Sequence, residues 1–219
     1  MDKKMKLSII IANYNQNMTI VNLLSQIDSW NPDAEVIIVD DGSKGEWNID
    51  DYKIDVKYYR QRDKGFRLWK AFNAGAKLAE GEYLMFLDGD TIAKDNFIEK
   101  IIPYLNPNRV ISLTRHAITD DGKIIPDDRK KRITEENFYE HATGGTLIIL
   151  KKLFNLCGGF DENYQYGLAD FDLAYKAMKQ GAEGYLSKVE IYHLEHEKYE
   201  YIKIRPEDRE RFKNLTSKE

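Results

Sequence analysis

Three apolar runs in this sequence each end in polar or acidic residues. The runs are KLSIIIANY (6–14), AEVIIVDDGS (34–43) and YLMFLDGDT (83–91). Continuous runs of this kind predict strands that are buried on both faces of a sheet. Segments with helical spacing of apolar residues separate them, at 17–30 and 65–82, and a further short strand is predicted at 56–61. This alternation predicts an α/β fold with a mostly parallel sheet and helices on both faces.

The second half of the sequence is less regular. Apolar patterns predict strands at 109–116 and 184–198, a strand and a short helix within 144–160, and a helix over 169–181. Residues 117–141 are polar and charged, which predicts either a mobile loop or an exposed hairpin. Residues 201–219 form a charged tail. The length allows one large domain or two small ones, and we expect a single domain over 1–219.

Composition narrows the class of protein. The 33 basic residues are outnumbered by 37 acidic ones, giving a net charge of −4 without a basic stripe, so a nucleic-acid partner is not expected. The single cysteine, Cys157, excludes an internal disulfide framework and suits a reducing compartment. No run reaches the roughly 18 apolar residues of a membrane span. We therefore expect a cytoplasmic protein, with peripheral contact to the inner face of the membrane left open.

The polar clusters that follow the three strands predict a binding site. In an open parallel sheet, ligands bind at the carboxyl ends of the strands. The clusters at 12–15, 40–43 and 88–90 all fall at such ends. One Asp-Gly pair alone is usually an ordinary turn. Three clusters along one predicted edge favour a shared crevice.

Asp88 and Asp90 are the most informative pair in these clusters. Two neighbouring carboxylates repel each other unless a cation or a proton lies between them. Mg²⁺ and Mn²⁺ prefer oxygen ligands and commonly use one or two carboxylates together with substrate phosphates. The pair therefore predicts a metal that in turn holds a diphosphate.

Four segments carry a resemblance to a known family. LSIIIANYN, VIIVDDGS, GEYLMFLDGD and GGTLIILKKLFNLCGGFDENYQYGLADFDLAYK resemble a family 2 glycosyltransferase with the GT-A fold, over roughly residues 5–197. The last segment also resembles the C-terminal part of galactosyltransferase-like enzymes. The resemblance implies a Rossmann-like nucleotide-binding half at 1–105, an acceptor and catalytic half at 106–200, and the charged tail beyond.

The resemblance also implies a set of donor-binding residues. Ala12 and Tyr14 would cradle the uracil ring, with Tyr14 stacking on the base. Asp41 would accept the uracil N3–H, and Arg67 would contact the nucleotide or its phosphates. Asp88 would face the ribose and the metal, and the donor sugar would lie along a glycine pair, Gly144 and Gly145.

The same resemblance implies that Asp170 is the catalytic base. The sequence departs from the usual Trp-Gly-x-Glu-Asp pattern at Tyr166, which replaces the tryptophan, and at Ala169, which replaces the glutamate and puts its acceptor contact in doubt. An alternative is that Asp170 is a helix N-terminal carboxylate favoured by the helix dipole. In that case Asp172 is the next candidate.

A histidine completes the metal site in the galactosyltransferase-like group. His193 matches its position, and imidazole is compatible with Mn²⁺. His196 lies three residues further on and is the rival ligand. The implied cofactor is Mn²⁺ or Mg²⁺, bound by Asp88, Asp90 and His193.

The implied activity is inverting transfer of a sugar from a UDP-sugar donor to a hydroxyl of a glycan or lipid-linked glycan acceptor, in cell-surface polysaccharide synthesis. Residues 117–141 would then close over the donor and exclude water, or would be a solvated excursion of the surface. The basic run 129–132 would touch an anionic acceptor or only solubilise this segment. The alternative function, supported by Ala169, is an inactive nucleotide-sugar-binding subunit of a glycan-assembly complex. A nucleotidyltransferase is disfavoured because no Gly-rich basic loop follows the first strand.

Overall fold

The computed structural model describes residues 7–45, 52–195 and 204–217. The strands are β1 (Leu7–Asn13), β2 (Ala34–Asp40), β3 (Val56–Arg60), β4 (Tyr83–Asp88), β5 (Thr91–Ile92), β6 (Arg109–Ile118), β7 (Ile124–Ile125), β8 (Leu147–Leu150) and β9 (Glu183–Leu194). The α-helices are α1 (Asn17–Trp30), α2 (Leu68–Leu78), α3 (Phe97–Ile101), α4 (Lys151–Leu156), α5 (Ala169–Lys179) and α6 (Pro206–Thr216). Short 3-10 turns lie at Ile102–Tyr104, Arg129–Lys131, Phe138–His141 and Gly144–Thr146.

The first four long strands form the expected parallel sheet, in the order β3-β2-β1-β4. Every residue of β1 and β2 is buried, as their uninterrupted apolar runs predict. The register places Asn13 beside Asp40 and Ala12 beside Asp88. The polar clusters at the strand ends therefore share one edge, as the sequence predicts.

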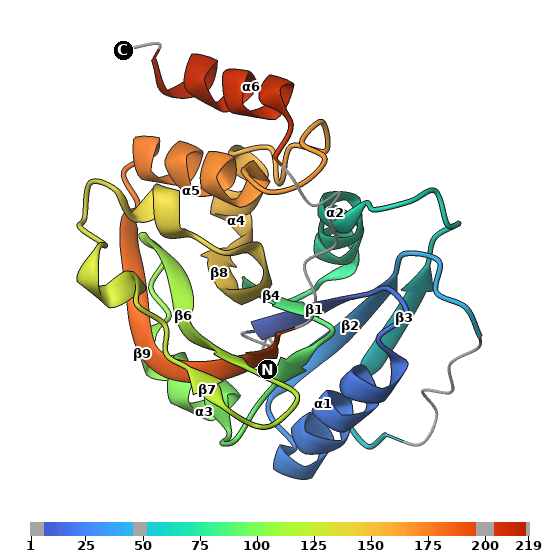
Figure 1. Ribbon diagram of the computed structural model, residues 1–219. Coiled ribbons are helices and arrows are strands. Elements are labelled where there is room, and N and C mark those ends of the chain that lie inside the picture. The colour runs from blue at the N-terminus through green and yellow to red at the C-terminus, as the bar shows by residue number, and fades with distance from the viewer. Residues whose placement is uncertain (1–6, 46–51, 196–203, 218–219) are drawn as a thin grey trace.

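The remaining strands make the sheet mixed rather than wholly parallel. β8 runs antiparallel between β4 and β6, and β6 pairs in parallel with β9. A register shift between Ser112 and Thr114 interrupts the β6–β9 ladder. The last part of β9 then pairs with β5, directly after β4, and sets His193 opposite Thr91. This pairing brings the far end of the chain back to the Asp88–Asp90 turn, and β9 can be followed along this flank in Figure 1.

Helices cover both faces of the sheet (Figure 1). One apolar core joins α1 and α3 to the sheet, and the other joins α2, α4 and α5 to the opposite face. The second core contains an aromatic cluster in which Phe72, Phe86 and Phe160 are in mutual contact, with centroids 4.9–5.6 Å apart. Helix α6 lies outside α5, where Phe212 contacts Phe171 at 6.0 Å between ring centroids.

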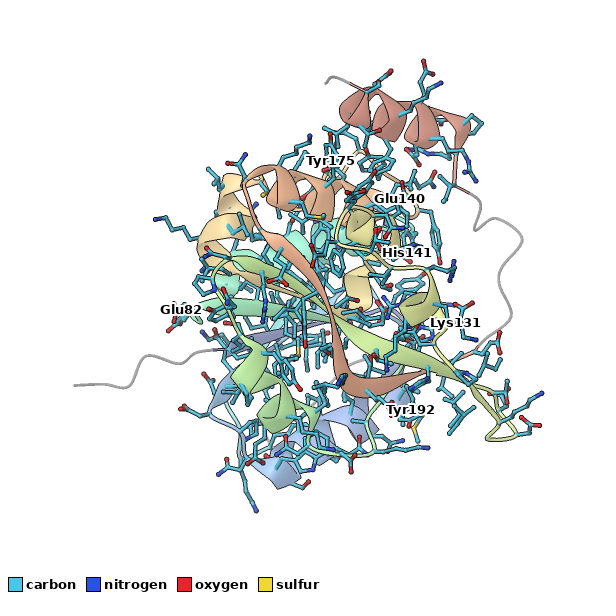
Figure 2. All side chains as sticks on the ribbon, turned by 90° about the vertical axis from the view of Figure 1, so that its left-hand side faces the viewer. Glu82, Lys131, Glu140, His141, Tyr175 and Tyr192 are labelled. Carbon is cyan, nitrogen blue, oxygen red and sulfur yellow. The ribbon has the colours of Figure 1, made fainter. Side chains whose placement is uncertain are left out.

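The polar segment 117–141 begins as a hairpin and is then tied down. Its first residues extend β6 to Ile118, and β7 pairs back on them. Arg129 is largely buried and forms an ion pair with the buried Asp127 at 2.7 Å. Its guanidinium also donates to Ser112 Oγ at 2.9 Å and to the His141 carbonyl at 3.0 Å. Lys131 and His141 lie on this segment beside β6 and β9 (Figure 2). Arg129 is thus a structural anchor, and the exposed basic part of the run is Lys130–Arg132.

Within the described ranges, no helix combines the length and the apolar character needed to cross a lipid bilayer.

Candidate active site

Asp88, Asp90 and His193 form one cluster at the carboxyl edge of the sheet. Asp88 ends β4, Asp90 lies in the turn that follows, and His193 is on β9. His193 Nε2 is 3.1 Å from Asp90 Oδ1 and 3.8 Å from Asp88 Oδ2. One ligand atom from each residue lies within 4.8 Å of the others. The structure therefore brings together the three residues proposed as metal ligands.

This cluster fits a hard divalent cation. Two carboxylate oxygens and one imidazole nitrogen are donors that Mn²⁺ accepts, and Mg²⁺ accepts the oxygens. The glycine pair closes one side of the cluster, because a Cβ on Gly145 would come within 2.1 Å of Asp88 Oδ2. Any side chain at this position would displace Asp88. A divalent ion here would offset the repulsion between two carboxylates held side by side.

Asp41 directly follows β2 at the same edge of the sheet and is held by two neighbours, Gln61 and Arg67. Its Oδ1 accepts hydrogen bonds from Gln61 Nε2 at 2.6 Å and Arg67 Nη2 at 2.7 Å. Its Oδ2 accepts from the Arg67 backbone N–H at 2.8 Å. Burial raises the pKa of Asp41, and the bonds from Gln61 and Arg67 oppose this rise. A carboxylate has about four acceptor positions, so Oδ2 keeps capacity for one more donor.

Ala12 and Tyr14 both lie at this edge, but Ala12 is buried and Tyr14 is exposed. Ala12 is buried in β1, beside Asp88 in register, and contributes a wall rather than a functional group. Tyr14 is 47% exposed, and its hydroxyl donates to Asp63 Oδ2 at 3.3 Å. Its ring is therefore available to a flat ligand. Arg67 Nε is buried and has no hydrogen-bond partner among the described residues, so the edge also has a spare donor.

Asp170 lies in the first turn of α5, facing the glycine pair. The chain turns sharply into this helix at Gly167 and Leu168, which both have left-handed backbone conformations. Leu168 has a φ of 63°, which is unusual for a side chain of its size. Asp170 Oδ2 accepts the Gly144 N–H at 3.0 Å, and Oδ1 accepts the Phe171 N–H at 3.0 Å. Burial raises its pKa to about 6, opposed by these bonds and aided by the charge of Asp88.

A model of the family described as "Glycosyl transferase family 2" matches residues 8–160, which is more than half of the chain. The chain belongs to this family. It is 27% identical over 82% of its length to a chondroitin synthase of Pasteurella multocida (strain Pm70). It spans 24% of that synthase.

Two solved structures share the GT-A fold of this family 2 chain. S. aureus TarS 1–349 in complex with UDP-GlcNAc has a TM-score of 0.74 and 21% identity, covering 96% of this chain and 64% of that TarS fragment. GalNAc-T7 with UDP, GalNAc and Mn²⁺ has a TM-score of 0.64 and 16% identity, covering 90% of this chain and 45% of GalNAc-T7. At these identities the likeness concerns the fold.

The structure explains how this family 2 chain departs from the Trp-Gly-x-Glu-Asp pattern. Ala169 is fully buried in the apolar core, where a glutamate would be costly. Tyr166 packs on Phe66 with ring centroids 4.6 Å apart. Asp172 is buried and paired with Lys176 at 2.5 Å, with the Tyr164 hydroxyl at 3.3 Å, so it braces α5. The rival metal ligand His196 lies outside the described residues.

Two site residues escaped the sequence reasoning. Gln61 directly follows β3 and donates a hydrogen bond to Asp41. The rule that ligands bind at the carboxyl ends of parallel strands also applies to β3 and would have indicated Gln61. Arg115 Nη1 lies 3.7 Å from Asp88 Oδ2. A charged residue directly after the buried stretch Val110–Thr114 of β6 is the sequence feature that could have indicated Arg115.

Proposed function

We propose that this family 2 protein is an inverting, metal-dependent glycosyltransferase that moves a sugar from a UDP-sugar to a hydroxyl of a glycan acceptor. The observation that carries the proposal is the placement of Asp170 in the first turn of a helix, hydrogen-bonded to the glycine pair that also abuts Asp88. One edge of the sheet thus combines a candidate base with a candidate metal site and a candidate uracil acceptor. The two solved structures of this fold, TarS with UDP-GlcNAc and GalNAc-T7 with UDP and Mn²⁺, support the donor and the cofactor.

The chemistry follows from the residues of this chain. Asp41 and Tyr14 bind and orient the base, and Asp88, Asp90 and His193 would hold the divalent ion. When bound, such an ion neutralises negative charge on the leaving diphosphate. Asp170 accepts the proton of the acceptor hydroxyl. The acceptor oxygen forms a bond to the anomeric carbon from the face opposite the diphosphate, and the bond to UDP breaks with its electron pair going to the phosphate oxygen.

The pKa of Asp170 suits this role. A carboxyl group with a pKa of about 6 is mostly ionised near neutral pH and is still a stronger base than an ordinary aspartate. Because the two halves of the sequence contribute different groups, we propose that residues 1–105 bind the nucleotide and that 106–200 supply the base and the acceptor side. The chondroitin synthase relative supports a polysaccharide as the acceptor.

The alternative is a nucleotide-sugar-binding subunit without transfer activity, favoured by Ala169 alone. Release of UDP from a panel of UDP-sugars, measured with a mixture of glycan acceptors and with Mn²⁺ present, separates the two. A transferase releases UDP with at least one donor, and release increases when an acceptor is added. Tight UDP-sugar binding with no release from any donor would support the binding subunit.

A further inference from the structure

Arg115 places a cationic side chain beside the candidate metal site. It lies on β6 opposite Ile191 of β9, and Ala117, two residues on, lies opposite His193. Its guanidinium Nη1 is 3.7 Å from Asp88 Oδ2, and 26% of its side chain is exposed. The guanidinium is therefore within reach of Asp88 and also open to a ligand.

The backbone of Arg115 is held in place by a buried network. Its N–H donates to Asp127 Oδ2 at 2.9 Å. Asp127 in turn accepts hydrogen bonds from the Arg129 guanidinium, with Nε at 3.0 Å and Nη2 at 2.7 Å. Because Arg129 also bonds Ser112, this network fixes the loop segment to β6. A side chain mounted in this way presents its charge at a defined position at little entropic cost.

The charges at the site leave a role for this arginine. The two carboxylate charges of Asp88 and Asp90 would balance the two positive charges of one divalent ion. The diphosphate of a sugar nucleotide carries about two negative charges, and the released diphosphate about one more near neutral pH. Arg115 is then a local positive charge that matches the charge appearing as the sugar leaves. A planar guanidinium also suits bidentate binding of phosphate oxygens.

We propose that Arg115 binds the terminal phosphate of the departing UDP and stabilises the charge that develops there. This inference rests on the proposed function. As the bond between the anomeric carbon and the phosphate oxygen breaks, that oxygen keeps the electron pair, and Arg115 donates hydrogen bonds to the phosphate. In the absence of a nucleotide, the same guanidinium faces Asp88. Arg115 is thus a catalytic residue contributed by the second half of the sheet.

The test compares UDP with UMP, which lacks the terminal phosphate. Calorimetry at fixed Mn²⁺ measures both nucleotides on the parent chain, Arg115→Gln, Arg115→Lys and the control Arg132→Gln. Arg132 is 56% exposed and pairs with Asp128 on the surface, so its replacement removes one arginine charge without touching Asp88. We expect Arg115→Gln to weaken UDP binding by about 10- to 100-fold, the loss of a charge-assisted hydrogen bond. UMP binding should stay within about twofold, and Arg115→Lys should recover part of the loss.

Three results would overturn the inference. Equal affinity of the parent and Arg115→Gln for UDP would show that Arg115 does not contact the terminal phosphate. Tighter Mn²⁺ binding by Arg115→Gln, with an unchanged ratio of UDP to UMP affinity, would make Arg115 only a counter-charge of Asp88. Weakening of UDP and UMP by the same factor, with a lower melting temperature, would make it structural. A parent chain that binds neither nucleotide would instead contradict the proposed function.

Discussion

The backbone N–H of Gly144 donates a hydrogen bond to Oδ2 of Asp170 across 3.0 Å. This bond ties the first turn of α5 to the glycine pair, whose second member lies against Asp88. The candidate base is thereby positioned relative to the candidate metal site by main-chain atoms rather than by flexible side chains. Such positioning is what general-base catalysis requires.

The pH dependence of transfer should follow Asp170. Only its ionised form can accept a proton, and its pKa is raised to about 6. Activity should therefore fall as the pH decreases through about 6 and level off above it. The measurement is the rate at saturating donor between about pH 5 and 8. UDP affinity over the same range is the control, since a parallel loss of affinity would assign the acid limb to the metal ligands.

Removal of one metal ligand should weaken nucleotide binding only when metal is present. We expect His193→Ala to reduce the affinity for Mn²⁺ by at least about tenfold, on the scale known for changes around metal sites. His141→Ala is the matched control, because His141 contributes its carbonyl oxygen to Arg129. Calorimetry of UDP with Mn²⁺ and with EDTA measures the effect. If EDTA leaves UDP affinity of the parent unchanged, the metal proposal is wrong.

Asp41 should determine the choice of base. The N3 atom of uracil donates a hydrogen bond, whereas N3 of cytosine accepts one. Asp41→Asn should weaken UDP by about 1–3 kcal/mol and reduce the preference for UDP over CDP. Asparagine retains an acceptor for Gln61 and Arg67, unlike alanine, which would leave the half-buried Arg67 unpaired. Competition binding with both nucleotides tests this, and an unchanged preference would make Asp41 a structural residue of the turn.

The pair Asp127 and Arg129 should stabilise the fold. Burial would raise the pKa of Asp127, but the hydrogen bonds and charge of Arg129 outweigh it, and the pKa lies below its usual value. Its stabilising contribution is therefore present above the unfolded pKa of about 3.9 and is lost as the pH falls through the lower folded pKa. Asp127→Asn should reduce the free energy of unfolding at neutral pH by about 3–5 kcal/mol, since Arg129 is left buried.

The control for this prediction is Asp128→Asn. Asp128 is the adjacent residue, is 63% exposed and pairs with Arg132. Its replacement should cost less than about 1 kcal/mol. Urea unfolding measures both variants. Equal midpoints for the two would show that the buried pair adds no more than a surface one.

The apolar pattern of the sequence predicted an element correctly where one continuous run of residues forms one helix or one strand. The helix predicted over 17–30 has those bounds, and the apolar runs at 6–14 and 34–43 contain β1 and β2. The helix predicted over 65–82 is shorter, because Arg67 turns toward Asp41 and the Gly81 N–H is used by Ser8 Oγ at 2.8 Å. These competing bonds come from residues distant in sequence, which periodicity cannot show.

The site was predictable where it followed strand ends or family motifs. Asp88, Asp90 and His193 were proposed together, and the structure brings them together. Arg115 was not found, because its approach to Asp88 depends on the pairing of β6 with β9 and on the register shift after Ser112. The role of Arg129 as an anchor likewise depends on contacts that span the second half of the chain.

The most direct test of the mechanism is the turnover of Asp170→Asn at saturating UDP-sugar and acceptor, measured beside its affinity for UDP. The substitution keeps the size of the side chain and removes the proton acceptor. Transfer should fall by roughly 10²–10⁴, the usual contribution of a positioned base, while UDP affinity stays within about twofold, because its proposed contacts lie on other segments. Turnover within a few-fold of the parent, with the fold intact, would contradict the assignment of Asp170 as the base.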